Sequence, residues 1–430
     1  MSIAEPNTNN VDQVDHLFLL VGENPLPNYV AAKVLLKENG TVYLVHSTNT
    51  SGEARILENK LKPIKVKTIS LDKKEGDSKY IRDTIGKYVE GLKKSSNELN
   101  LGINYTGGTK AMSVNAYRAV LDAVKDCNPQ YSYLDARNLQ MLIEREGKSP
   151  SAIPVDVQVN FAELFSLHNL RWKQHNPPNY TPILYNVAEE FLHAYLSDTS
   201  KGASSIAGQW QNWCRDKLEY GRKDKDNFWS ENLIQANTIV SLNSAPEKIK
   251  VILDNFDVLD KKGNLDLGSF KNKGFAQYSD ACAWLSGIWL EHYVLEMVKS
   301  VVSGFPAIHE CAMSFHIDDP ASGNDKYDRF EFDVAFMRDY QLFALSCTTS
   351  GFKPICKQKL FEAHLRARQL GGDEARVALV CFNNYPDGIE RDLAVTLRDK
   401  KVVVFGSKDL QTDKFKKKLK QWIEINSPVL

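Results

Sequence analysis

The sequence predicts an α/β protein in which two α/β domains are separated by a mainly helical region. Over the first 150 residues, apolar strand-like segments alternate with helical segments, an order typical of a doubly wound parallel sheet. Near the C-terminus, a pair of strand-like segments is followed by a helix and a further strand. The length of 430 residues allows two or three domains with their own cores. We predict an N-terminal domain at 1–153, a linker at 154–181, a helical region at 182–275 and a C-terminal domain at 276–430.

The N-terminal domain begins with HLFLLV (16–21), an unbroken apolar run of the kind that a parallel sheet covers on both faces. Further strands are predicted at 42–46, 64–69 and 101–105, and YSYLDARNLQMLI (131–143) predicts a hairpin with its tip at 135–138. Helices are predicted after the first strand, from about 78 to 94, and after Thr109, where apolar residues keep a helical period.

The C-terminal domain is predicted to begin with a helix at 281–298. Residues 328–339 and 340–347 predict two strands joined at Arg338 and Asp339. A helix then ends on Gly371 and Gly372, strands follow at 376–382 and 401–405, and an amphipathic helix closes the chain. Between the domains, the polar RWKQHNPPNYT (171–181) indicates a linker, and tryptophans at 210, 213 and 229 are expected to pack the helical region.

The composition excludes several classes of protein. Lys plus Arg and Asp plus Glu each number 54, so the charge balance does not indicate a protein that coats nucleic acid or a membrane surface. A nucleic-acid site, if present, must be a local basic groove. The polar start of the chain lacks the apolar stretch of a signal peptide, and no run of about 18 apolar residues is present. We therefore expect a cytoplasmic protein without a membrane span.

Cysteine and histidine usage does not indicate a zinc site. The seven cysteines, at 127, 214, 282, 311, 347, 356 and 381, are scattered without the close pairs of a zinc knuckle. We expect reduced and mostly buried thiols. His292 follows Glu291, but a single histidine on a helix is more typical of packing or solvation than of metal binding.

The turn in NYTGGTKAM (104–112) joins the fourth predicted strand to a helix. It is not the phosphate loop of nucleoside triphosphatases, which needs a glycine, four residues and then Gly-Lys-Ser/Thr. Polar or small residues also follow the first and second strands, at 22–28 and 47–48. Such strand ends meet where an open α/β sheet binds its ligands, and the helix amides with Lys110 favour an anion. Taken alone, the turn favours a tight strand-to-helix connection with a surface lysine.

The motifs LLVGENPLPN (19–28) and NYTGGTKAM, with the final hairpin, resemble the CARF family, the CRISPR-associated Rossmann fold that senses cyclic oligoadenylates. The resemblance covers about residues 14–145. It implies a homodimer that binds cyclic tetra-adenylate or a related ring, produced by a type III CRISPR complex, on its two-fold axis. The residues that match the ligand loops are Gly22, Asn28, Ser47, Thr48, Asn104, Thr106, Gly107, Gly108, Thr109 and Lys110.

The order strand pair, helix, strand resembles the core of PD-(D/E)xK nucleases, and WLEHYV (289–294) resembles the opening of the nuclease domain in CARF nucleases. The resemblance implies a restriction-endonuclease-like domain whose carboxylates hold Mg²⁺ or Mn²⁺ for cleavage of DNA or RNA. Glu291, Glu331 and Asp333 occupy the acidic positions. Glu331 and Asp333 share a strand face because side chains alternate. Without the flanking pattern, two exposed acids on an edge strand would be the preferred interpretation.

One departure from the nuclease pattern puts the activity in doubt. The strand that should carry Glu-x-Lys reads ALSCTTS, so Ser346 stands in the place of the glutamate and Thr348 in the place of the lysine. Lys353, Lys357 and Lys359 follow closely. One of them enters the site, or all three form a solvated basic stretch before the helix.

Three functions are therefore compatible with the sequence. The first is a nuclease that responds to cyclic oligoadenylate through a modified metal site. The second is a sensor or ligand sink with a degenerate nuclease domain. The third is a ring nuclease that cuts the bound adenylate, for which positioning of a 2′-hydroxyl by Ser47, Thr106 and Lys110 would suffice.

Overall fold

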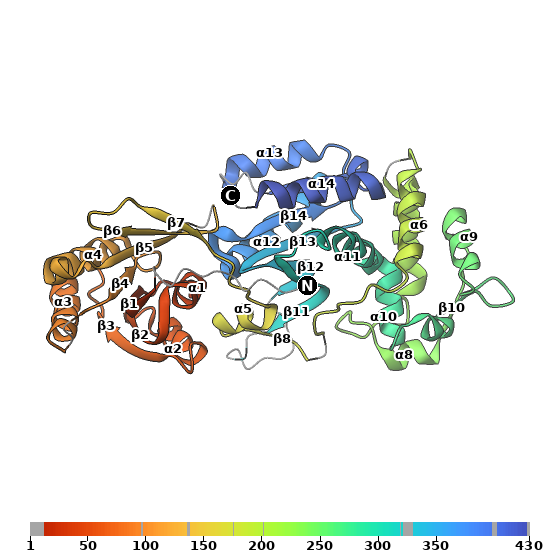
Figure 1. The fold of residues 1–430 in the computed structure, drawn as a ribbon. Helices are drawn as coiled ribbons and strands as arrows, with labels where there is room; N and C mark the ends of the chain where they lie inside the picture. Colours follow the sequence, from red (N-terminus) through yellow and green to blue (C-terminus); the bar gives the residue numbers. More distant parts are fainter. Residues whose placement is uncertain are drawn as a thin grey trace, which may run out of the picture.

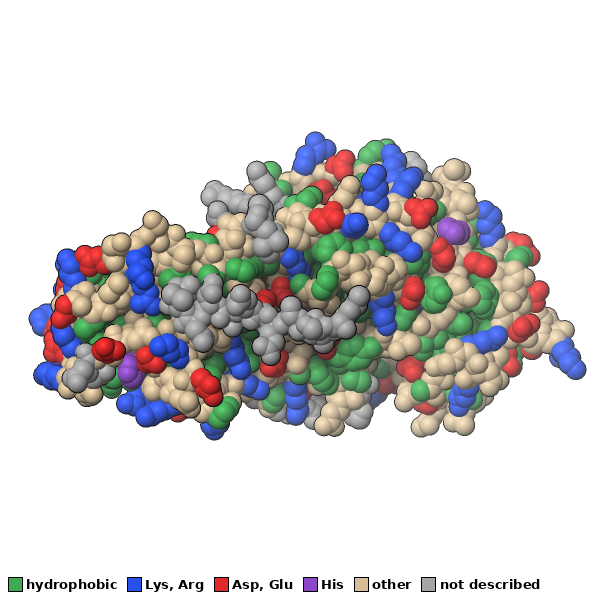
Figure 2. All heavy atoms as spheres, viewed as in Figure 1, with side chains coloured by type: hydrophobic (Ala, Val, Ile, Leu, Met, Phe, Trp, Pro, Cys, Tyr) green, Lys and Arg blue, Asp and Glu red, His purple; other side chains and the backbone are tan. Residues whose placement is uncertain are grey.

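The computed structural model describes residues 13–95, 98–135, 138–174, 176–200, 202–318, 320, 330–397 and 402–427. Figure 1 shows two sheet-containing blocks and a helical block side by side, with the C-terminal block in the middle. Among the described residues, no helix combines the length and the apolar character needed to cross a bilayer. On the face that Figure 2 shows, basic and acidic side chains are interspersed, as the equal numbers of the two kinds lead one to expect.

The N-terminal block contains a seven-stranded sheet in the order β3-β2-β1-β4-β5-β6-β7. The first five strands pair in parallel, and β6 and β7 add antiparallel pairs at the edge. The strands are β1 (Val14–Leu20), β2 (Leu36–His46), β3 (Lys65–Ser70), β4 (Leu101–Asn104), β5 (Gln130–Asp135), β6 (Gln140–Arg145) and β7 (Ser151–Pro154). The helices are α1 (Leu26–Leu35), α2 (Ser51–Lys60), α3 (Ser78–Ser95) and α4 (Lys110–Val124).

Two strands of this sheet differ from the sequence prediction. Strand β2 begins at Leu36, and the register to β1 shifts between Val14 and His16. Asn39 has a φ of +65°, so the residues before Thr41 form an irregular turn within the strand. Strand β7 was not predicted because SAIP is short and mostly exposed.

The C-terminal block contains a six-stranded sheet in the order β15-β14-β13-β12-β11-β8. The predicted strand pair is confirmed as β12 and β13, which are antiparallel and joined at Asp339 and Tyr340. The strands are β8 (Arg171–Trp172), β11 (Ile308–Asp318), β12 (Phe330–Arg338), β13 (Gln341–Cys347), β14 (Arg376–Val380) and β15 (Val403–Phe405). The helices are α11 (Trp289–Val302), α12 (Lys353–Gly371), α13 (Pro386–Leu397) and α14 (Thr412–Ile425).

The region between the sheets is mainly helical and packs against the C-terminal sheet. Trp210 and Trp213 are buried and stacked on each other, and the indole N–H of Trp210 donates to the carbonyl of Leu285. Apolar residues of this region therefore form one core with apolar residues of the C-terminal sheet. Its elements are α6 (Tyr185–Leu196), α7 (Ile206–Trp213), α8 (Glu231–Ala236), β9 (Ile239–Val240), α9 (Glu247–Asn255), β10 (Leu265–Asp266) and α10 (Tyr278–Ala283). A π-helical turn, Trp284–Ile288, joins α10 to α11, where the sequence predicted one helix.

The segment predicted as a linker contributes to the packed structure. It contains α5 (Phe161–Leu167) and β8, and β8 pairs with β11. Phe165 of α5 packs on Phe315 and Phe332 of the C-terminal sheet, while Glu163 accepts a hydrogen bond from Tyr29 of α1. Apolar residues of both sheets and α5 form one continuous core. The predicted α/β fold class is confirmed, and the domain boundaries stay predictions.

Candidate functional site

The first group of predicted residues lies at the carboxyl ends of three neighbouring strands. Strands β1, β2 and β4 end at Leu20, His46 and Asn104, and β1 lies between the other two. The chain winds from β1 to one side through β2 and β3, and then crosses to β4 on the other side. This is the topological switch point at which open α/β sheets bind ligands.

The loops that follow β1 and β4 touch each other through glycines. A Cβ atom built on Gly22 would lie 3.1 Å from the backbone nitrogen of Gly108, and one built on Gly107 would lie 2.2 Å from the carbonyl oxygen of Leu20. Gly108 has a φ of +73°, a conformation that favours glycine. The glycines of the two motifs are therefore needed for the close approach of the two loops.

Two predicted ligand residues lie beneath these loops. Asn28 and Asn104 are fully buried. The side-chain amide of Asn28 donates to the carbonyl of Leu20 at 2.9 Å. Asn104 accepts from the backbone N–H of Thr106 at 3.2 Å and donates to the hydroxyl of Ser132 at 3.1 Å. Both side chains hold the loops in place, and direct contacts from them to a ligand stay a prediction.

Among the predicted ligand residues, the exposed ones are Thr48, Thr109 and Lys110. Thr109 caps α4, because its hydroxyl accepts the backbone N–H of Met112, and Lys110 is the first residue of that helix. The free amides of a helix N-terminus attract anions, and a lysine there adds a full positive charge. Ser47 is buried, and its backbone N–H donates to the hydroxyl of Thr50. The structure thus brings the predicted loops together around an exposed, anion-attracting helix start.

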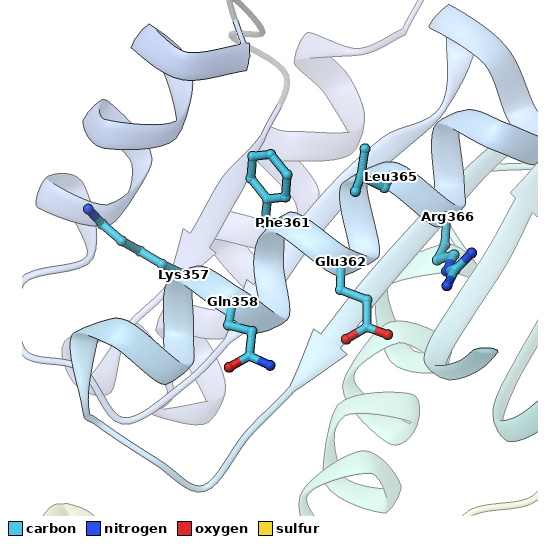
Figure 3. A pocket seen from close by; sticks show the side chains of 6 residues that line it. All are labelled: Lys357, Gln358, Phe361, Glu362, Leu365 and Arg366. Carbon is cyan, nitrogen blue, oxygen red and sulfur yellow. The ribbon is translucent and has the colours of Figure 1, made fainter. Parts of the chain in front are cut away.

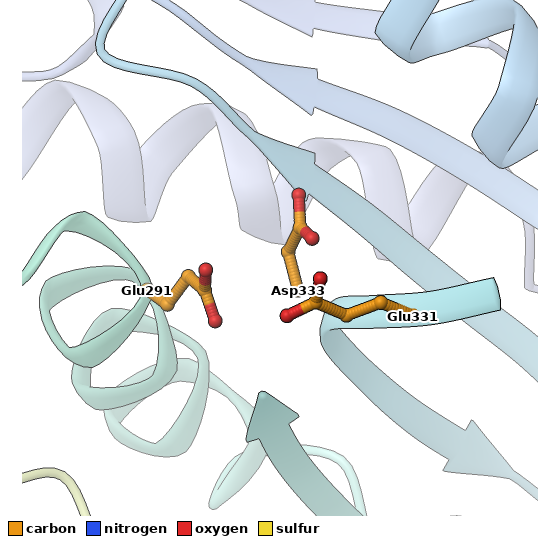
Figure 4. Close-up of side chains that lie close together, drawn as sticks. All are labelled: Glu291, Glu331 and Asp333. Atoms are coloured by element: carbon orange, nitrogen blue, oxygen red, sulfur yellow. The ribbon is translucent and has the colours of Figure 1, made fainter. Parts of the chain in front are cut away.

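The second group is an acidic cluster made of Glu291, Glu331 and Asp333. One oxygen of each carboxylate lies within 4.8 Å of those of the other two. Glu291 comes from α11, and the other two come from alternate positions of β12. Figure 4 shows the three carboxylates pointing toward one another. Glu291 and Asp333 are buried, whereas Glu331 is exposed.

Hydrogen bonds orient two of these carboxylates. Asp333 Oδ2 accepts from the hydroxyl of Ser346 at 3.0 Å and from the backbone N–H of Cys347 at 2.6 Å. The hydroxyl of Ser314 donates to Glu291. Ser314 lies in β11 with a φ of +51°, an unusual conformation for a non-glycine residue within a strand. Sequence reasoning missed Ser314 because β11 was not recognised as a strand.

Burial raises the pKa values of two members of the acidic cluster, Glu291 and Asp333. The pKa of Glu291 lies well above its usual value, first because the group is buried and then because of the charges of Asp333 and Glu331. The pKa of Asp333 is also raised, mainly by burial. A divalent cation bound between the carboxylates would offset the unfavourable free energy of keeping their negative charges buried and close together.

The acidic cluster fits Mg²⁺ or Mn²⁺. These ions prefer oxygen ligands. The donor oxygens around an octahedral ion lie at most about 4.2 Å apart, so a small change of side-chain angles would bring the carboxylates into range. His292 does not join them, since its Nδ1 accepts the backbone N–H of Ile183 and burial lowers its pKa to about 3. All seven cysteines are free thiols.

The structure distinguishes the three lysines that follow β13. Lys353 and Lys357 both pair with Asp392 of α13, at 2.9 and 2.5 Å. Lys359 lines a pocket of about 100 Å³ together with Glu331, Asp333 and Ser346. Lys359 is exposed but lies beside the acidic cluster, whereas Lys353 and Lys357 face Asp392.

Comparisons with known proteins agree with this architecture. Residues 279–426 match the family of Card1-like endonuclease domains. The fold is similar to that of protein VC1899 from Vibrio cholerae, with a TM-score of 0.68 and 15% identity over 96% of this chain and 99% of that one. It is also similar to Can2 from Sulfobacillus thermosulfidooxidans, solved in complex with cyclic tetra-adenylate, with a TM-score of 0.64 and 14% identity over 95% of this chain and 99% of that one. No match to a curated protein sequence was found.

The part of the chain that matches the family model contains all three members of the acidic cluster, and the similarity to Can2 extends through the N-terminal sheet. Residues 279–426 are therefore similar to Card1-like endonuclease domains, and the chain as a whole shares the fold of VC1899 and Can2.

Proposed function

We propose that this protein is a nuclease of type III CRISPR defence that a cyclic oligoadenylate controls. In this proposal the N-terminal loops bind the ring, and the acidic cluster of the C-terminal domain cleaves a nucleic acid. The observation that carries the proposal is the acidic cluster, because its three carboxylates converge within a domain that matches Card1-like endonucleases. The complex of Can2 with cyclic tetra-adenylate, in a protein of the same overall fold, supports that ring as the ligand.

Each residue of the proposed nuclease site has a definite task. Glu291, Glu331 and Asp333 would hold one or two Mg²⁺ or Mn²⁺ ions. Ser346 and the backbone N–H of Cys347 fix the carboxylate of Asp333. The metal would supply positive charge at the attacking water and at the leaving oxygen of a phosphodiester.

We further propose that two copies of the chain share one ring. A ring of four identical nucleotides has a two-fold axis, and a symmetric dimer presents the same loops from both sides. Lys110 and the amides at the start of α4 would then meet phosphates of the ring. Calorimetry should give one ring for every two chains.

The proposal is tested by incubating the protein with Mn²⁺, cyclic tetra-adenylate and labelled DNA and RNA, while both the polymers and the ring are followed. Cleavage of a polymer only when the ring and metal are present is the expected result. Cleavage of the ring alone would instead indicate a ring nuclease. Absence of ring binding would contradict the N-terminal assignment.

A second candidate function is a sensor or ligand sink without nuclease activity. Ser346 and Thr348 favour it, because they stand where the nuclease pattern has a glutamate and a lysine. Ring binding without cleavage of any polymer under the same conditions would support this candidate.

A further inference from the structure

One face of α12 turns toward the acidic cluster. Lys359, Glu362, Ala363 and Arg366 line the same pocket as Glu331, Asp333 and Ser346. Their spacing of three, four and seven residues places them on one side of a helix. The nuclease pattern has a lysine on the strand where this chain has Thr348. In this chain, the lysine of the pocket comes instead from helix α12, as Lys359.

Lys359 differs in its surroundings from the other lysines of this helix. Lys353 and Lys357 pair with Asp392, on the side of α12 that faces α13. Figure 3 shows Lys357 extending toward α13, while Glu362 and Arg366 point to the other side of the helix. Lys359 instead lines the pocket that holds Glu331 and Asp333. A lysine is protonated at neutral pH, so Lys359 places a positive charge beside the acidic cluster.

The strand itself provides no cation at this place, since residues 344–350 read ALSCTTS. Asp333 keeps its position through Ser346 and Cys347, so the carboxylate does not depend on the missing residues. What the pocket still needs for phosphodiester cleavage is a positive charge near the non-bridging phosphate oxygens. Lys359 is a flexible side chain on a rigid helix at the wall of that pocket.

We propose that Lys359 is a catalytic residue whose ammonium group contacts a non-bridging oxygen of the scissile phosphate. This inference rests on the proposed nuclease function. In the reaction a water oxygen forms a bond to phosphorus, and the bond from phosphorus to the leaving sugar oxygen breaks. The attacking water gives up one proton to solvent, and the leaving oxygen takes up one proton. Lys359 keeps its proton and offsets the charge that develops on the phosphate.

The first measurement is single-turnover cleavage with Mn²⁺ and cyclic tetra-adenylate in the Lys359→Ala protein. Loss of a charge that faces the developing negative charge should lower the rate about 100- to 1,000-fold. The matched control is Lys357→Ala, on the same helix. Because an exposed ion pair contributes little, this control should stay within about threefold of the unmodified protein. A rate unchanged in Lys359→Ala would overturn the proposal.

A second variant tests whether the charge itself is what matters. Adding Thr348→Lys to the Lys359→Ala protein returns a lysine to the strand and should recover part of the lost rate. Lys359→Arg, which keeps the charge, should lose less than Lys359→Ala. If neither variant exceeds Lys359→Ala while all three melt at the temperature of the unmodified protein, the electrostatic role is wrong.

Oligonucleotide binding provides a readout that is independent of cleavage. Labelled single-stranded DNA and RNA are titrated into the full-length protein with Ca²⁺ and cyclic tetra-adenylate. Lys359→Ala should weaken binding about tenfold, as expected for a charged hydrogen bond, and lower the salt slope by about one. If the unmodified protein cleaves nothing, the proposed function fails. In that case the binding measurement alone tests the contact between Lys359 and the nucleic acid. Unchanged affinity in Lys359→Ala overturns that contact, and a loss of affinity confined to this variant supports it.

Discussion

Gly372, at the end of α12, lies directly against Asn24 in the loop that follows β1. A Cβ atom built on Gly372 would be 2.7 Å from Asn24 Nδ2, and Gly372 has a φ of +64°. Asn24 accepts the backbone N–H of Leu26 at the start of α1. Nearby, Nε2 of His168, the residue that follows α5, donates to the carbonyl of Leu370 at 2.9 Å. A single helix thus runs from the ligand loop of one domain to the acidic cluster of the other.

Gly372→Ala should weaken the coupling between ring binding and cleavage. The added methyl group would push against Asn24, and alanine does not favour this backbone conformation. We expect ring affinity to change less than ring-stimulated cleavage, which should fall about tenfold, a typical size for a coupling free energy. Asn24→Ala removes the contact without backbone strain and should act in the same direction. The control is Gly91→Ala, since a Cβ built there has no neighbour within 4 Å. If the ring stimulated cleavage equally in all variants, the contact between Gly372 and Asn24 would be excluded as the link between ring binding and cleavage.

Lys110→Ala should weaken binding of cyclic tetra-adenylate by about 1.5–3 kcal/mol, the range for a hydrogen bond to a charged group. The helix start would keep its amides but lose the lysine charge. Calorimetry with the ring measures this directly. Lys79→Ala is a matched control, because Lys79 is an exposed lysine in the first turn of α3. An affinity of Lys110→Ala equal to that of the control would remove Lys110 from the ligand site.

The acidic cluster should bind Mn²⁺, and binding should stabilise the folded protein by mass action. We expect Mn²⁺ to raise the melting temperature of the unmodified protein. Replacing two ligands at constant size, with Glu331→Gln and Asp333→Asn, should abolish that rise. Asp413→Asn, an exposed acid in the first turn of α14, serves as the control. A full Mn²⁺-dependent shift in the double variant would mean that the metal binds elsewhere.

The raised pKa of Asp339 leads to a prediction of how the stability of the protein depends on pH. Burial is the main cause that raises its pKa to about 6, whereas its value in the unfolded chain is about 3.9. The folded state therefore binds this proton more tightly, and the contribution to stability is lost as the pH rises from about 4 through 6. Asp339→Asn should make the protein more stable than the unmodified form at pH 8, by about 1–3 kcal/mol, with a smaller gain at pH 5.

Chemical denaturation across this pH range checks that prediction. Asparagine tolerates the positive φ of +49° at residue 339 as aspartate does. Asp257→Asn is the matched control, because Asp257 is exposed and has a φ of +52°. If the free energies of unfolding of Asp339→Asn and the unmodified protein differed by the same amount from pH 5 to pH 8, the assignment of the proton to Asp339 would be contradicted.

The parts of the fold that the sequence predicted are those with strong local signals. Strand β1 was recognised because a strand covered on both faces is an unbroken apolar run. Strand β11 was missed because IHECAMSFHID mixes polar and apolar residues without strict alternation, and Ser314 was missed with it. Strand β8 has only two residues and depends on its pairing with β11.

Prediction of the site from the sequence was limited in the same way, because only local spacing can be recognised there. Glu331 and Asp333 were predicted to share a face because their spacing determines it. Helical spacing could have grouped Lys359 with Glu362 and Arg366, but only the packing of α12 shows which face of the helix meets the acidic cluster. The two motifs that contain Asn28 and Asn104 do not reveal that both side chains are buried, because burial depends on how the loops close over them.

The most direct test of a ring-controlled nuclease is one titration of cleavage against cyclic tetra-adenylate, carried out with Mn²⁺ for three proteins. The unmodified protein should show a saturable rise. Lys110→Ala should reach the same plateau at a higher ring concentration, whereas Asp333→Asn should bind the ring with normal affinity and show no cleavage at any concentration. Cleavage that does not respond to the ring, or that survives in Asp333→Asn, would contradict the account.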